Sequence, residues 1–379
     1  MGSWQKVVEQ VEFREELMKL GQQPGTNIRE LCRRFQVSPK TYYKWRWRYQ
    51  RQANEGLKNQ PRRPQHSPRK SPAEIEEAIL DLRRQYPYWG ARKLQSVWQQ
   101  SLGKEAPARS TIQDILKRNG CIDEGESRKH QPWRRFEYAE PNQLWQIDFK
   151  GWPKKQTGYR CEPLSVVDDH SRYAVCLEAC PNQQTETVRV CLTKVFRKYG
   201  LPEQMVMDNG SPWGYDNRYR HTPLTTWLMT LGIRVSHCRP YHPQTQGKVE
   251  RFHRTLELEL LTRKQFPNRE TLQRGLDQWR ELYNQFRPHE ALNMQTPSTR
   301  YRISTRQFPE TLPLPEYEPT DEVRLVDARG NISFRGRRVF ISKGFQGSNV
   351  ALRHTLSEGV FELFFFRQKV AEINLRLLT

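Results

Sequence analysis

Apolar residues at the start of the chain recur at the spacing of amphipathic helices, and they predict three such helices. The first spans residues 8–20, and after a glycine-rich break Thr26 is placed to cap the second. Ser38 and Pro39 then form a turn in which the serine caps, and the proline opens, the third helix. This order is typical of a helix-turn-helix domain, which we place at residues 1–52.

The hydrophobic pattern changes three more times along the chain. Residues 73–121 show three short helical segments and predict a second helical domain that binds DNA. Residues 143–302 show strands in a row, then strands alternating with helices, which indicates a mixed sheet with helices packed on it. Residues 321–379 show short apolar runs separated mostly by glycines, as in a small β-barrel. Basic or proline-rich linkers are expected between these domains, at residues 53–72, 122–142 and 303–320.

The charge of the chain adds a class of partner to this picture. A net charge of +21 on 45.3 kDa, with a pI near 9.8, indicates a polyanionic partner. Residues 1–70 carry 16 Lys and Arg against 6 Asp and Glu, so about half of the excess lies there. Ribosomal proteins and membrane-surface proteins are also this basic, so charge alone names no chemistry.

The composition also bounds the compartment. No run approaches the roughly 18 apolar residues of a membrane span, and the N-terminus lacks the apolar segment of a signal peptide. The seven cysteines are an odd number without the spacing of a disulfide framework, which favours reduced, buried thiols. We therefore expect a cytoplasmic protein without a membrane partner.

The third helix of the first domain interleaves cations with aromatic residues, in the segment KTYYKWRWR. Such a face suits phosphate contacts around a helix that reads the major groove. The alternative is an ordinary three-helix domain with a solvated basic face, and the turn chemistry favours DNA binding. The predicted DNA contacts are Lys40, Tyr42, Lys44, Arg46 and Arg48, with Arg62 and Arg63 in the first basic linker and Arg134 and Arg135 in the second.

Three acidic residues lie in settings that favour catalysis. Asp148 ends an apolar strand within LWQIDFKG, and Asp208 lies where a short strand turns within MVMDNGS. Glu250 lies on a helix within HPQTQGKVERFHRTL, at the edge of its apolar stripe, so that it can face a site. The residues of that stripe, which we expect to be buried, are Val249, Phe252, Leu256 and Leu260.

Three neighbouring carboxylates repel one another unless divalent cations neutralise them. Oxygen ligands suit Mg²⁺, for which Mn²⁺ can substitute, and two such ions can activate an attacking water or 3′-hydroxyl and stabilise the leaving oxygen. The alternative, without catalysis, is that the aspartates are turn residues and the glutamate is solvated. We predict that Asp148, Asp208 and Glu250 bind metal and catalyse, and that cations of the same helix contact DNA: Lys248, Arg251 and Arg254.

The flanking motifs decide between these readings, because together they resemble DDE-type insertion-sequence transposases, relatives of retroviral integrases. The matching segments are LWQIDFKG, SVVDDHSRYAV, VMDNGSPWG, RPYHPQTQGKVERFHRTL and YNQFRPHEAL, in this order within residues 128–302. The similarity is closest to the bacterial branch that includes the IS-three and IS-four-eight-one groups. It implies an RNase H-like α/β core in which Asp148, Asp208 and Glu250 fall on the catalytic acids, preceded by helix-turn-helix domains that recognise terminal repeats.

The chain departs from the superfamily in two ways. Glu250 follows Asp208 by 42 positions, a long interval in which Pro212–Pro223 looks like an inserted loop of open role. No histidine precedes His66, so the N-terminal zinc module of retroviral integrases is absent, which favours the transposase branch. Trp213 of the loop either stacks on a base or anchors the loop, and the aspartates of SVVDDHSRYAV are interpreted as turn or supporting residues rather than ligands.

The expected function is DNA transposition. The protein would bind the terminal inverted repeats of an insertion sequence, cut at its ends and transfer the 3′-hydroxyl to target DNA with two Mg²⁺ ions. Because two ends must be joined together, we expect a homodimer or a larger assembly on double-stranded DNA, in the nucleoid of a bacterial cytoplasm. The alternatives are an inactive, domesticated transposase that regulates through DNA binding, and an RNase H-like nuclease that cuts without joining.

Overall fold

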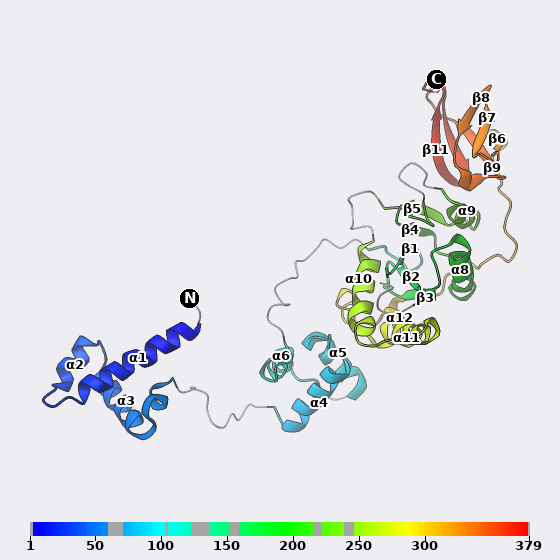
Figure 1. Cartoon of the computed structure of the whole chain (residues 1–379). Coiled ribbons are helices and arrows are strands. Elements are labelled where there is room, and N and C mark those ends of the chain that lie inside the picture. Colours follow the sequence, from blue (N-terminus) through cyan, green and yellow to red (C-terminus); the bar gives the residue numbers. More distant parts are fainter. Residues whose placement is uncertain are drawn as a thin grey trace. The chain divides into compact units, whose positions relative to one another are not determined.

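The computed structural model describes most of the chain in two compact units, which divide between Lys70 and Ser71 (Figure 1). The described residues are 3–59, 71–102, 105–122, 137–151, 159–214, 221–238 and 246–377.

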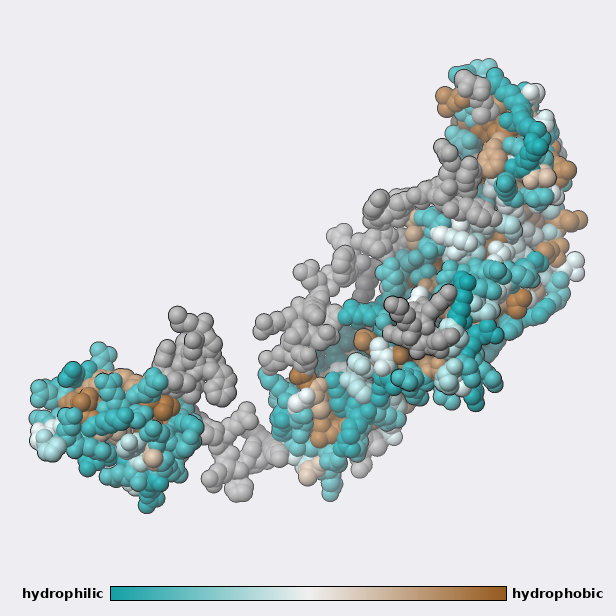
Figure 2. Space-filling view, in the orientation of Figure 1, coloured by the Kyte–Doolittle hydropathy of each residue, from teal (hydrophilic) through white to brown (hydrophobic). Residues whose placement is uncertain are grey.

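The described part of the first unit is helical, as predicted. Its elements are α1 (Ser3–Gly21), α2 (Ile28–Arg34), α3 (Pro39–Gln52) and the 3₁₀ turn η1 (Ala53–Leu57). They enclose a small core with Leu17, Met18, Cys32 and Tyr42, and Leu57 of η1 completes it. The compact fold therefore continues past residue 52, because η1 returns an apolar side chain to the core. On the face drawn in Figure 2, hydrophilic residues dominate the surface of this unit.

The helix caps of the first unit agree with the sequence at one helix and differ at another. Ser38 caps α3 by accepting the backbone N–H of Thr41 at 3.1 Å, with Pro39 in the first turn, as predicted. The cap of α2 is Asn27, whose carboxamide accepts the N–H of Arg29 at 3.1 Å, so the assignment of Thr26 was wrong by one residue. Asn caps helices as well as Thr does, which makes adjacent candidates hard to separate.

The second unit begins with three more helices, followed by a five-stranded sheet and its covering helices. The first three are α4 (Ala73–Gln85), α5 (Ala91–Leu102) and α6 (Arg109–Arg118). The strands are β1 (Leu144–Phe149), β2 (Glu162–Asp168), β3 (Ala174–Cys180), β4 (Gln204–Met207) and β5 (Arg234–His237). The covering elements are α8 (Thr185–Tyr199), α9 (Pro223–Thr230), α10 (Gly247–Leu256) with the π-helical turn η4 (Glu257–Leu261), and α11 (Arg269–Glu281) with the π-helical turn η5 (Leu282–Phe286); η6 (Glu290–Leu292) and α12 (Pro297–Arg300) follow.

The order of the strands is β3-β2-β1-β4-β5 (Figure 1). β1, β2 and β3 pair antiparallel, whereas β1, β4 and β5 pair parallel. One face of the sheet packs with α8 and α9, and the other packs with α10 and α11, where the predicted stripe of α10 is fully buried. This is the RNase H-like arrangement that was predicted.

The C-terminal region is all β except for one short turn, η7 (Lys343–Phe345). Its strands are β6 (Glu322–Leu325), β7 (Asn331–Phe334), β8 (Arg337–Phe340), β9 (Asn349–His354), β10 (Val360–Phe365) and β11 (Gln368–Asn374). The pairings recorded among the described residues form a four-stranded sheet, β11-β10-β9-β6, and a hairpin, β7-β8, and do not close a barrel.

This β region is attached to the five-stranded sheet through β5 and the start of α9. The carboxamide of Gln368 accepts the N–H of Val235 at 3.1 Å and donates to its C=O at 2.9 Å, so it pairs with β5 as a strand would. Gly344 approaches the backbone of His221 so closely that a Cβ would lie 2.6 Å from the carbonyl oxygen. Part of the predicted linker also packs on the core, where Ser304 donates its N–H to Tyr199 O at 3.0 Å.

Two further expectations concern thiols and membranes. All seven cysteines are free, and five of them are buried, as expected for reduced thiols. Among the described residues, helices are too short or too polar to cross a bilayer.

Candidate active site

Asp148 lies on β1 with its carboxylate partly shielded from solvent. One carboxylate oxygen accepts the N–H of Phe149 at 2.8 Å, and the side chain is 24% exposed. Burial raises the pKa of Asp148 to about 6, and the neighbouring charges of Asp208 and Glu250 add to this effect. The Phe149 N–H and the charge of Lys150 therefore compensate the ionised form only in part.

Asp208 follows β4 directly, next to the end of β1. Because β1 and β4 are parallel neighbours, their carboxyl ends meet at the same edge of the sheet. The Asp208 carboxylate accepts the N–H of Gly210 at 3.2 Å, and His237 hydrogen-bonds the Asp208 backbone carbonyl at 2.8 Å. Burial nevertheless raises the pKa of Asp208.

Glu250 is exposed on the first turn of α10, and its charge reaches the same place. Burial and the charges of all three acids raise the pKa of the Cys238 thiol to about 11, so all three acids act electrostatically on the residue that follows β5. Among the described residues, no group of three or more His, Cys, Asp or Glu side chains is close enough to hold a metal ion as it stands. The acids are thus electrostatic neighbours that do not form a closed ligand set.

His253 is a site residue that the sequence analysis missed. Its Nδ1 lies 3.7 Å from a carboxylate oxygen of Asp148, and its Nε2 forms a hydrogen bond of 3.0 Å with the hydroxyl of Ser165. Burial lowers the pKa of His253 to about 3, so the ring is neutral and adds no positive charge beside Asp148. Its position three residues after Glu250, facing the sheet, was the available signal.

Two of the predicted DNA contacts on α10 are exposed and one is not. Arg251 and Arg254 lie on the exposed face of the helix. The Lys248 side chain is only 16% exposed, and its ammonium forms an ion pair with the carboxylate of Asp169, which is fully buried. Lys248 therefore has a partner within the protein, because its position on the first turn of α10 brings it to the end of β2.

Both aspartates of the SVVDDHSRYAV motif support the backbone or neighbouring side chains, as interpreted. Asp168 accepts the N–H groups of Asn142 at 2.7 Å and Ser171 at 2.8 Å. Asp169 accepts the N–H of Tyr138 at 2.9 Å in addition to its ion pair. Both side chains are buried.

The inserted loop is pinned at its ends. Trp213 is buried beside the ring of Phe149, with 5.8 Å between ring centroids, so it anchors the loop. Thr222 donates its hydroxyl to Pro212 O at 2.8 Å, which ties the two ends together. Residues 215–220 lie outside the described residues.

The candidate DNA-binding face of α3 differs in part from the prediction. Lys40 and Lys44 are exposed and Arg46 and Arg48 are half-buried, but Tyr42 is buried in the core, so its assignment as a DNA contact was wrong. The exposed aromatic residues of this helix are Tyr43 and Trp47, at 53% and 56%, with the Arg51 guanidinium 4.2 Å from the Trp47 ring centroid. The predicted contacts that lie outside the described residues are Arg62, Arg63, Arg134 and Arg135.

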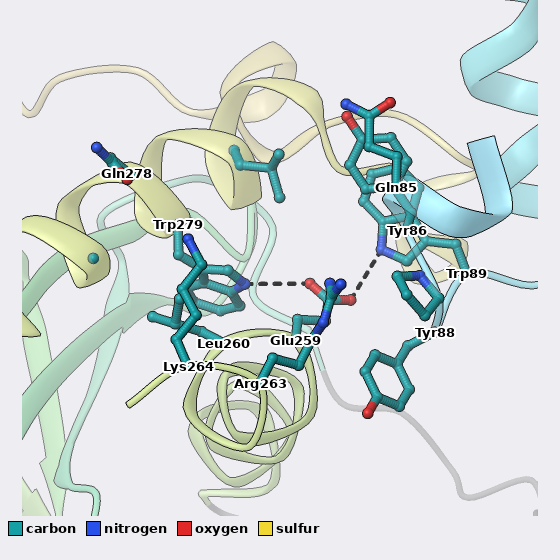
Figure 3. Close-up of a pocket in the computed structure, with 13 residues that line it drawn as sticks. Gln85, Tyr86, Tyr88, Trp89, Glu259, Leu260, Arg263, Lys264, Gln278 and Trp279 are labelled. Carbon is teal, nitrogen blue, oxygen red and sulfur yellow. Dashed lines mark hydrogen bonds between the residues drawn. The ribbon is translucent and has the colours of Figure 1, made fainter. Parts of the chain in front are cut away.

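A second cluster of polar and aromatic residues lies at the other end of the α10–η4 run. The Glu259 carboxylate accepts the indole N–H groups of Trp89 at 3.0 Å and Trp279 at 3.3 Å (Figure 3). It also accepts an N–H of the Arg287 guanidinium at 2.9 Å. Tyr86 stacks on Trp89 at 4.0 Å. We call Trp89, Glu259, Trp279 and Arg287 the Glu259 junction, since they attach the α4–α6 helices to the catalytic sheet's helices beside a pocket of about 210 Å³.

Family models match most of the chain. The Integrase core domain matches residues 139–243 and, in a second model, residues 231–297. The IS481 family transposase, C-terminal domain, matches residues 321–378. A Homeodomain-like domain matches residues 41–116 and a Helix-turn-helix domain matches residues 13–65. The chain therefore matches an integrase core domain followed by the C-terminal domain of IS481 family transposases, after helix-turn-helix segments.

The chain is similar to proteins of bacterial mobile elements. It is 27% identical over 158 residues to the Insertion element IS407 uncharacterized 31.7 kDa protein of Burkholderia multivorans, which covers 42% of this chain and 54% of that protein. It is 23% identical over 204 residues to the putative transposase for insertion sequence element IS5376 of Geobacillus stearothermophilus, with 51% and 48% covered. The chain thus spans about half the length of these relatives.

Among solved structures, the chain is similar to the catalytic core domain of BIV integrase. The two are 23% identical, with 42% of this chain and 92% of that domain covered and a TM-score of 0.32.

Proposed function

We propose that this transposase binds the terminal inverted repeats of an insertion sequence, hydrolyses a phosphodiester at each end and joins the freed 3′-hydroxyl to target DNA. The observation that carries the proposal is the meeting of Asp148 and Asp208 at one edge of the sheet, with Glu250 beside them on α10. The resemblance of the flanking motifs to DDE-type transposases supports a catalytic role for each of the three acids.

The donor set fits divalent cations. Burial raises the pKa of Asp148 and of Asp208, so their ionised forms are less favoured than in water and nearby positive charge would stabilise them. The nearby cation Lys150 is paired with Glu257 at 3.0 Å, and His253 is neutral. Oxygen donors favour Mg²⁺, with Mn²⁺ as a substitute, and Asp148, Asp208 and Glu250 would hold two such ions.

When bound, these ions would activate the attacking hydroxyl and stabilise the leaving oxygen. The chain's own residues supply position and charge. Arg251 and Arg254 lie on the exposed face of α10, where they would hold DNA phosphates next to Glu250. His253 and the N–H of Phe149 restrain the Asp148 carboxylate from the protein side.

The helical domains would recognise the DNA ends. On α3, Lys40 and Lys44 would contact phosphates, while Tyr43 and Trp47 present apolar surface to the groove. Domains at residues 1–52 and 73–121, with the linkers between them, would each bind part of the terminal repeat. Two ends must be joined together, so the active form would be a homodimer or larger assembly on nucleoid DNA in a bacterial cytoplasm.

The test is a strand-transfer reaction with Mg²⁺ and labelled DNA ends from the element that flanks the gene. We expect the wild type to join ends to target, and Asp208→Asn to bind ends normally but join them more than about a thousandfold more slowly, since it removes a metal ligand. Asp277→Asn, an exposed acid on α11, is the matched control and should join as the wild type does. Binding by both without reaction by either would support the inactive regulator, and cutting without joining would support the nuclease.

A further inference from the structure

Two glutamine side chains connect the start of α10 to β1, directly beside the acids. Gln246 donates its side-chain N–H to the carbonyl of Ile147 at 3.3 Å. Gln146 accepts the backbone N–H of Val249 at 3.1 Å. On β1 the contacted residues immediately precede Asp148, and on α10 Val249 immediately precedes the third acid. The two contacts therefore fix the elements that carry two of the three acids to each other.

A buried ion pair between Lys248 of α10 and Asp169, which follows β2, adds to this connection. Gln146 also donates its N–H to the carboxylate of Asp169 at 3.0 Å, and that carboxylate pairs with the ammonium of Lys248. One amide thus acts as acceptor toward α10 and as donor toward Asp169, which a carboxylate or an apolar side chain of the same size cannot do. The α10 clamp is the name used below for Gln146, Asp169, Gln246 and Lys248.

The clamp lies in the interior, where polar groups are costly to place. Asp169 is fully buried and Gln146 is 2% exposed. A buried ion pair is weak support for stability, because well-packed apolar residues of similar volume often serve stability as well or better. Its directional contacts can instead fix one arrangement of α10 against the sheet.

We infer that the α10 clamp sets the position of Glu250 relative to Asp148, with Asp169 and Gln146 as positioning residues for the metal site. This inference rests on the proposed function. Glu250 is itself exposed, so its carboxylate is oriented through the placement of its helix. Displacements of about 1 Å cost catalysis about a hundredfold, and residues that support metal ligands typically change metal affinity by about 10- to 100-fold.

The first experiment measures Mn²⁺ binding by electron paramagnetic resonance on the full chain, with no DNA present. Gln146→Glu keeps the acceptor for Val249 but turns a carboxylate toward Asp169, and Asp169→Asn keeps the shape without the charge. We expect both to weaken Mn²⁺ binding by about tenfold or more. The control is Asp321→Asn, which removes another acid with a buried side chain. The Asp321 carboxylate lies 2.8 Å from the Arg353 guanidinium, in the C-terminal β region. This variant should leave Mn²⁺ affinity unchanged.

A double variant separates positioning from folding. Asp169→Asn alone leaves the Lys248 ammonium without its partner and can unfold the protein. Asp169→Asn with Lys248→Met removes both charges and keeps the volume, so the chain should fold while Mn²⁺ affinity and strand transfer stay low. If the double variant and Gln146→Glu fold and bind Mn²⁺ as the wild type does, the clamp is structural only and the inference is overturned.

Lys248 itself distinguishes this inference from a direct DNA contact. If Lys248 bound a phosphate, Lys248→Met would weaken DNA binding and lower the salt dependence of the binding constant by about one counterion. The clamp predicts unchanged DNA affinity and reduced Mn²⁺ affinity. A wild type that binds no Mn²⁺ and joins no ends would refute the proposed function, whereas a wild type that does both, with unaltered clamp variants, refutes the clamp alone.

Discussion

The helical run from Gly247 to Leu261 carries Glu250 near its start and Glu259 near its end. The surroundings of these two acids differ in how far they neutralise negative charge. At the start, Glu250 adds its charge to Asp148 and Asp208, whose pKa values are raised by burial. At the end, the Glu259 side chain is 9% exposed, yet two indole N–H groups and a guanidinium surround its carboxylate.

The difference separates an acid that holds the fold together from acids that we propose bind metal ions. The Glu259 junction supplies its own hydrogen-bond donors and positive charge, so its acid stabilises the contact between α4–α6 and the core. The three site acids have the N–H groups of Phe149 and Gly210 but a shortage of positive charge. A bound divalent cation would supply the missing positive charge.

The largest expected effect comes from removing the charge of Glu259, which the protein itself neutralises. Glu259→Gln keeps the size of the side chain but leaves the buried Arg287 guanidinium without its counter-charge, so the free energy of unfolding should fall by about 3–5 kcal/mol. Chemical denaturation measures it. The control is Glu257→Gln, two residues earlier and half exposed, which should change stability by less than about 1 kcal/mol. Equal effects of the two variants would contradict the contrast.

At the site near Glu250, removing the acid Asp148 should instead raise the free energy of unfolding. Without metal, Asp148 titrates near 6 in the folded protein and near 3.8 in the unfolded chain. Between these pH values only the folded state keeps the proton, so wild-type stability falls as the pH rises, by about 2–3 kcal/mol in all. Asp148→Asn lacks this loss and should be more stable than the wild type at pH 7.5, with the gap closing below pH 4.

Denaturation in EDTA at several pH values tests this reversal of sign. An Asp148→Asn protein that is less stable than the wild type at pH 7.5 would show that the carboxylate is compensated within the chain after all.

A smaller effect should come from adding the cation. Mg²⁺ at ten times its dissociation constant should stabilise the wild type by about 1.4 kcal/mol. Asp208→Asn should lose this increment, whereas Glu259→Gln should keep it despite its lower starting stability. Thermal melts with and without Mg²⁺ measure both, and a loss of the increment in Glu259→Gln would mean that the two ends are not independent.

The smallest effect is expected between the two ends, on the exposed face of α10. Arg254→Ala should change stability by no more than about 0.5 kcal/mol. Removing one phosphate contact should lower the slope of the DNA binding constant against salt concentration by about 0.9 on logarithmic axes. Fluorescence anisotropy at several salt concentrations measures that slope, and an unchanged slope would place the DNA elsewhere.

The features that sequence predicted are those with local causes. The apolar stripe of α10 follows from its 3.6-residue period, and the Ser38-Pro39 start of α3 follows from cap chemistry. On α3, however, two tyrosines are adjacent in sequence, and packing against α1 decides that Tyr42 is buried and Tyr43 exposed. Periodicity in a helix rich in aromatic residues on several faces does not make that choice.

The features that sequence missed depend on contacts between distant positions. Gln146 contacts a residue 103 positions away, and Trp89 contacts Glu259 across 170 positions. Lys248 looked like a surface cation because nothing near it in sequence offers a carboxylate pointing inward. Only the packing of α10 on the sheet brings Asp169 to it.

The raised pKa of Asp148 has a consequence for inheritance. If Asp148 has the proposed role, a gene copy in which it has changed to asparagine would lose the reaction, and the encoded protein should be more stable near neutral pH. Since most random substitutions destabilise, such a copy would tolerate later changes that would unfold its active parent, and it would keep both sets of helices that we propose bind DNA. Immobile descendants that still occupied the ends of the element would then persist in a lineage and restrain their active relatives.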